Sequence, residues 1–173
     1  MPALAARVRD LCLFRIGPQD LPYSLPDARL LSVLLMLLAG VGLAGHGVAV
    51  VDMLPRLLLA LVFLLLPAWL LLRLRGRPER YVQTLTAIAG VGVLYNLLVL
   101  PLAMLVQGAD PRSSPVAGLL AWLVIALTFW RIAVSGHIWR HALDIPFAFG
   151  ALLASVLFMA QILLVRWLFV PVA

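Results

Sequence analysis

The sequence contains no lysine, a single cysteine and few charged residues of any kind. Its 13 basic residues are all arginine, and charged residues make up 12% of its 173 positions, against about 25% in an ordinary soluble domain. Cys12 alone cannot form an internal disulfide, and no cysteine and histidine spacing resembles a zinc site. A small fold stabilised by internal disulfides or structural zinc is therefore excluded.

Hydrophobic residues make up 65% of the chain. A soluble globule of this length buries only about 68–70% of its unfolded surface, so much of this apolar excess would face water. A lipid bilayer around the chain would cover this apolar surface and keep it from water. The net charge of +6 does not indicate nucleic-acid binding, because no stretch combines clustered basic residues with stacking aromatics.

Five segments are long and apolar enough to cross a membrane, which takes about 20 residues of helix. The sequence therefore predicts an all-α polytopic transmembrane bundle of five spanning helices. The first apolar run is too long for a signal-peptide core, so we expect it to stay as an anchor. We divide the chain into an N-terminal cytoplasmic or interfacial segment at 1–27 and a transmembrane domain at 28–173, with spans at about 28–51, 53–72, 81–106, 115–136 and 145–170.

The N-terminal segment predicts a short interfacial helix. Leu4, Val8, Leu11 and Phe14 recur at helical spacing over 2–16, with arginines between them. Such a helix would lie flat on the membrane surface. The glycine- and proline-rich stretch that follows predicts a connector, with Asp27 as the cap of the first span.

The arginines predict the orientation, because short arginine-rich loops stay in the cytoplasm. Three arginines lie at one end of the predicted spans and ten at the other, which favours a cytoplasmic N-terminus and an external C-terminus. Exclusive use of arginine is typical of a GC-rich genome, so we expect a bacterial inner membrane. The three are Arg56, Arg112 and Arg166, and the ten are Arg7, Arg9, Arg15, Arg29, Arg73, Arg75, Arg77, Arg80, Arg131 and Arg140.

His137, His141 and Asp144 are spaced to share one helix face at the end of the fourth span. Two imidazoles and a carboxylate can hold a divalent metal, but no fourth ligand is evident and the glutamate of a zincin motif is missing. We interpret them as interfacial polar residues, with a metal site as the alternative. A haem site is disfavoured further, because His46 lies at the other end of the bundle from His137 and His141. We expect no cofactor.

Among the polar residues inside the predicted spans we single out four: Tyr95, Asn96, Arg131 and Gln161. Such groups usually make hydrogen bonds between helices, and they could also line the path of a small transporter or channel. An intramembrane arginine indicates function by default. We nevertheless expect Arg131 to snorkel to the nearby cytoplasmic interface, because the apolar part of its helix ends near Ser135.

Nothing in the sequence indicates an enzyme. Ser135 and His137 lie two residues apart on one helix and point in different directions, so they cannot act as nucleophile and base. We therefore expect a non-enzymatic scaffold or accessory subunit that contacts other membrane proteins or a second copy. Its basic faces would meet anionic headgroups or an acidic partner on the cytoplasmic side through Arg73, Arg75, Arg77, Arg80 and Arg140.

The later spans resemble the Yip (Ypt-interacting protein) domain family. The resemblance lies in RYVQTLT at 80–86, LP at 100–101 and AVSGHIWRHAL at 133–143, and it covers about 100 of the 173 residues. In that family five spans follow a cytoplasmic N-terminal region, and a basic loop precedes the third. The resemblance implies a role in membrane organisation, as eukaryotic members act in vesicle traffic with small GTPases, and it implies no catalytic residue.

Overall fold

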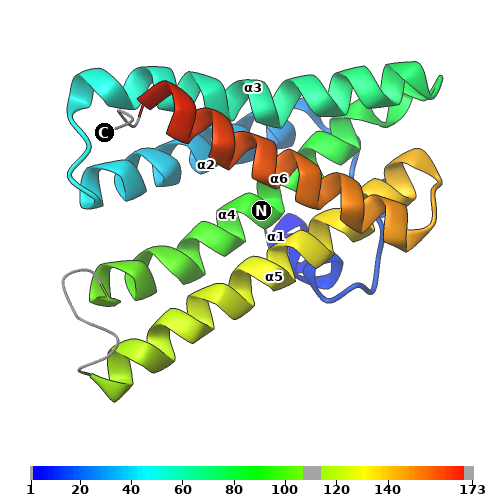
Figure 1. Ribbon diagram of the computed structural model, residues 1–173. Helices are drawn as coiled ribbons and strands as arrows, with labels where there is room; N and C mark the ends of the chain where they lie inside the picture. Colours follow the sequence, from blue (N-terminus) through cyan, green and yellow to red (C-terminus); the bar gives the residue numbers. More distant parts are fainter. Residues whose placement is uncertain (1, 107–113, 170–173) are drawn as a thin grey trace.

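The computed structural model describes residues 2–106 and 114–169, and Figure 1 shows how their helices are arranged. Within those ranges the regular structure is entirely helical, which confirms the predicted fold class. The helices are α1 (Pro2–Cys12), α2 (Leu25–Gly45), α3 (Val50–Leu74), α4 (Tyr81–Val106), α5 (Pro115–Leu143) and α6 (Phe147–Phe169), with short 3-10 turns η1 (Pro18–Asp20) and η2 (Pro78–Arg80).

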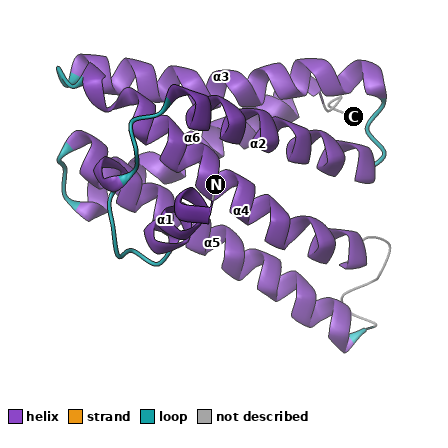
Figure 2. Cartoon of the chain, turned by 180° about the vertical axis from the view of Figure 1, so that it is seen from behind, coloured by secondary structure: helices purple, strands orange, loops and turns teal. Residues whose placement is uncertain are grey.

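Helices α2 to α6 are each long and apolar enough to span a membrane. The chain is therefore a multi-pass integral membrane protein, as the hydropathy of the sequence predicts. Successive spans run in opposite directions (Figures 1 and 2). The starts of α2, α4 and α6 and the ends of α3 and α5 thus share one end of the bundle, here called the basic end.

The first helical hairpin differs from the sequence prediction at its boundaries. Helix α2 starts three residues early because Ser24, not Asp27, is its cap: the Ser24 hydroxyl accepts a hydrogen bond from the Asp27 amide at 3.3 Å. The break between the first two spans lies at 46–49, where Gly47 adopts a φ of +72°. Pro55 lies inside α3, in its second turn.

Helix α5 continues without a break to Leu143, seven residues beyond the predicted span. It ends where Asp144 enters the left-handed region at φ 49°, a conformation that aspartate tolerates better than most residues. Helix α6 then starts at Phe147, two residues later than predicted.

Two glycines allow α5 and α6 to touch backbone to backbone. A Cβ atom on Gly150 would lie 2.4 Å from the carbonyl oxygen of Gly136, and one on Gly136 would lie 2.7 Å from the Cα of Ala151. From this contact near the basic end the two helices diverge toward the opposite end (Figure 1). Gly92 also allows α4 to pack closely on α2, since a Cβ atom there would lie 2.9 Å from the Leu35 side chain.

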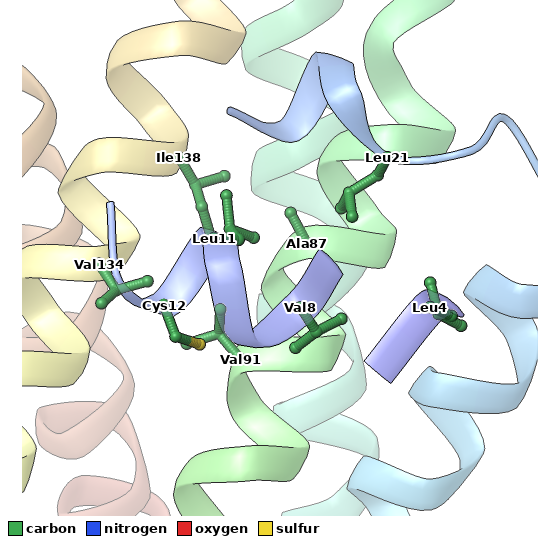
Figure 3. Close-up of a cluster of buried hydrophobic side chains, with 9 residues drawn as sticks. All are labelled: Leu4, Val8, Leu11, Cys12, Leu21, Ala87, Val91, Val134 and Ile138. Atoms are coloured by element: carbon green, nitrogen blue, oxygen red, sulfur yellow. The ribbon is translucent and has the colours of Figure 1, made fainter. Parts of the chain in front are cut away.

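Helix α1 lies across the bundle and packs into it (Figure 3). Its face of Leu4, Val8, Leu11 and Cys12 is buried against Ala87 and Val91 of α4 and Val134 and Ile138 of α5. The predicted helix is thus present, but it ends at Cys12. Phe14 lies in the following turn with φ 60° and is 42% exposed, so its predicted place on the apolar face is wrong.

Candidate functional site

The polar residues that the sequence distributes over three spans meet around one cavity inside the bundle. Asn96 of α4, Arg131 of α5 and Gln161 of α6 line a cavity of about 210 Å³. All five spanning helices contribute to its wall, whose apolar part includes Leu35 of α2 and Phe63 of α3. The cavity therefore lies at the centre of the bundle.

A smaller cavity of about 90 Å³ lies mainly between α5 and α6. It shares Arg131 and Gln161 with the larger one, so the two spaces meet at these side chains. Ser135 adds a hydroxyl, and Phe158 adds an aromatic wall. Each volume is below the roughly 300–1,000 Å³ of typical small-molecule sites. The space fits a small polar group better than a bulky ligand.

Arg131 points into the bundle and not toward the basic end. Its guanidinium carbon lies 4.7 Å from the ring centroid of Tyr95 and 5.9 Å from that of Phe158. Tyr95 lies about one turn beyond Val91, the level at which α1 crosses α4. Helical side chains lean toward the helix N-terminus, which for α5 is at the opposite end. The prediction that Arg131 snorkels to the cytoplasmic interface is therefore wrong.

The charge of Arg131 has no carboxylate partner in the described part of the chain. The ion pairs there are Arg9 with Asp10, and Arg77 and Arg80 with Asp144. Two cation–π contacts remain, each worth about 2 kcal/mol or more when water is excluded. A charged residue costs about 2.5–3.5 kcal/mol at a helix centre, and more by some accounts. The rings hold the guanidinium in place but do not neutralise it.

Hydrogen bonds hold the other polar groups of the site. The Thr128 hydroxyl donates to the Val124 carbonyl at 2.8 Å and accepts from the Tyr95 hydroxyl at 2.9 Å, which orients the Tyr95 ring under Arg131. The Asn96 amide nitrogen donates to the Gly92 carbonyl at 2.8 Å, so its side-chain oxygen stays available to a ligand. Sequence reasoning missed Thr128, although its spacing of three residues from Arg131 signals a shared helix face.

A second cluster of charged residues lies at the basic end. Asp144 accepts hydrogen bonds from Arg77 and, at 3.3 Å, from Arg80. Arg80 also donates to the His141 carbonyl at 2.9 Å. These two arginines therefore join η2 to the end of α5. Of the five arginines predicted to meet headgroups, the other three are exposed: Arg73, Arg75 and Arg140.

The three residues of the possible metal site do not come together. The rings of His137 and His141 are 4.6 Å apart at their centroids, but His137 donates its Nε2 proton to the Ile16 carbonyl at 3.0 Å. Asp144 leaves the helix in its left-handed conformation and faces the arginines instead. No cluster of three histidine, cysteine or acidic side chains suited to a metal occurs among the described residues.

No protein-family model, curated protein or solved structure matches this chain, so the resemblance to Yip-domain proteins stays a prediction.

Proposed function

We propose that this membrane protein is a non-enzymatic scaffold or accessory subunit that pairs Arg131 with an acidic side chain from another membrane protein. The observation that carries the proposal is the inward-pointing guanidinium beside a polar cavity, without a carboxylate partner in the described chain. Ionisable groups inside membranes pair with one another, because lipid offers them no solvation. An aspartate or glutamate on a partner helix would supply the missing charge.

The shape of the site supports a partner helix. The smaller cavity lies where α5 and α6 begin to diverge, and it adjoins Arg131 and Gln161. Arginine binds a carboxylate through two parallel hydrogen bonds, and the Gln161 side-chain N–H groups can donate further ones.

The partner is a different protein under this proposal. A second copy of the chain has no acidic residue near the middle of its spans within the described ranges. Exposed Arg73, Arg75 and Arg140 would add contacts to anionic headgroups on the cytoplasmic side, with the chain in a bacterial inner membrane and its N-terminus in the cytoplasm. A membrane-organising role of the Yip kind agrees with this arrangement.

Replacing Arg131 with leucine tests the proposal. We expect Arg131→Leu to lose a co-purifying membrane protein after gentle detergent extraction at native abundance, and Arg131→Lys to keep part of it. Arg166→Leu is the matched control, because Arg166 is exposed and lines neither cavity. Mass spectrometry of the extracts measures the partner. Identical partners for wild type and Arg131→Leu, at equal abundance, would refute the proposal.

A small transporter or channel is the second candidate, because all five spans line the polar cavity. Reconstitution into vesicles distinguishes the two functions. Flux of ions or metabolites that is lost on Asn96→Leu, with no co-purifying protein, would favour transport through Tyr95, Asn96, Arg131 and Gln161. Absence of flux together with an Arg131-dependent partner would favour the accessory subunit.

A further inference from the structure

An apolar groove lies on the surface of the bundle where α1 crosses α2 and α4. Its volume is about 420 Å³, which falls within the range of small-molecule sites. Ala5 of α1, Leu34 of α2, and Leu94 and Leu97 of α4 are among the residues that line it. Arg9 is the charged residue among those that line it. The groove therefore combines a long aliphatic wall with a single cation at its rim.

We propose that this groove holds one acyl chain of an anionic membrane phospholipid, and that Arg9 binds the phosphate of the same molecule. The groove follows the spans inward from α1, since Leu97 lies sixteen residues after Tyr81, about 24 Å along α4. At that depth the surroundings are acyl chains. A peptide would leave its backbone polar groups unsatisfied against this aliphatic wall, whereas an acyl chain has none.

The position of α1 places the cation where a headgroup would lie. Helix α1 crosses α4 with its apolar face inward, as an interfacial helix does (Figure 3). Arg9 bonds to the Asp10 carboxylate at 3.0 Å, but the Arg9 side chain is 64% exposed, so solvent weakens that pair. A phosphate accepts two parallel hydrogen bonds from a guanidinium. The neighbouring exposed Arg7 and Arg15 raise the local preference for an anionic lipid.

Native mass spectrometry of the purified full chain tests the proposal, with dioleoyl-phosphatidylglycerol and dioleoyl-phosphatidylcholine as probes. We expect Arg9→Gln to bind phosphatidylglycerol about fivefold more weakly, the size expected for one surface arginine. Phosphatidylcholine should lose less, because its choline cation neutralises the phosphate that Arg9 would hold. Ala5→Phe should weaken both lipids by filling the groove. Arg166→Gln is the matched control, because Arg166 is exposed, lies on α6 and does not line the groove. Glycerophosphoglycerol, which has no acyl chains, should not bind.

Two results would overturn the inference. Equal phosphatidylglycerol binding by wild type and Arg9→Gln would show that Arg9 does not hold the phosphate. If Ala5→Phe changed the oligomeric state and left lipid occupancy unchanged, the groove would be an interface between copies of the chain. Because Arg9 is exposed, its replacement leaves the fold intact even if Ala5→Phe does not.

Discussion

Cys12 reports whether α1 is docked on the bundle or lies free in the membrane interface. Its side chain is 2% exposed, and burial raises the pKa of its thiol from 9.0 to about 11. The thiolate is the form that reacts with maleimides, and at pH 8 a pKa of about 11 leaves about a thousandth of the thiol ionised. The docked helix therefore protects the thiol in two ways. It shields the sulfur from the reagent, and it keeps the thiol in its un-ionised, unreactive form.

We expect Cys12 in intact membranes to react with a maleimide at least tenfold more slowly than in protein unfolded by detergent. Its rate should keep rising with pH beyond 9, because the folded thiol ionises only near its raised pKa, whereas the unfolded thiol should level off near 9. Leu13→Cys in a Cys12→Ser background is the matched control, since Leu13 is 50% exposed. Equal labelling rates for the two cysteines would mean that α1 is not docked.

The polar residues of the central site could be identified from the sequence, but their meeting could not. Tyr95, Asn96, Arg131 and Gln161 stand out because each interrupts an apolar span. Which way each one faces depends on helix rotation, and α4 and α5 are apolar nearly all the way round, so hydropathy carries little information about their inner faces. The sequence misplaces the Arg131 guanidinium for two reasons. Helix α5 continues to Leu143, which puts Arg131 about three turns from the basic end, and helical side chains lean toward the helix N-terminus.

At the scale of elements, the contact between α5 and α6 depends on Gly136 and Gly150. We expect Gly150→Ala to destabilise the protein by about 1–3 kcal/mol, because the new methyl would overlap the backbone of α5 and that backbone cannot move aside. Thermal unfolding in detergent measures the change. Gly40→Ala is the matched control: its nearest neighbour would be Leu57 at an ordinary 3.8 Å. A Gly150→Ala protein as stable as this control would contradict the assigned contact.

The existence of each element was predictable, while several ends were not. A long run of apolar residues indicates a membrane-spanning helix, because in lipid every backbone N–H and C=O group must be hydrogen-bonded within the protein. The ends depend on single caps such as Ser24 and Asp144, and on prolines such as Pro55 that the first turns of a helix accommodate. For α1 the spacing of apolar residues indicated the buried face correctly. It could not show that this face meets α4 and α5 in place of lipid.

At the scale of the whole molecule, charge asymmetry predicts the orientation, and the structure changes how the charges are counted. Arg131 faces the interior, so it does not act as a loop charge, and the basic end keeps nine arginines against three. Only charges near the ends of spans influence insertion, so this smaller difference still favours a cytoplasmic N-terminus. Arg112 lies outside the described residues and is counted from the sequence alone.

Replacing Arg73, Arg75, Arg77 and Arg80 together with alanine removes the basic loop between α3 and α4 and leaves five arginines against three. We expect a mixed orientation, measured as the appearance of cytoplasmic fluorescence from a C-terminal fluorescent-protein fusion that is dark when exported.

Arg77→Ala with Arg80→Ala is the matched control, because it breaks the pairs with Asp144 but keeps two loop charges. If this double variant lost stability but kept one orientation, the ion pairs with Asp144 would stabilise the fold, and the loop charges would set the orientation. A wild-type fusion that is already fluorescent would place the C-terminus in the cytoplasm and reverse the assignment, since the arginine-rich end would then face outward against the charge rule.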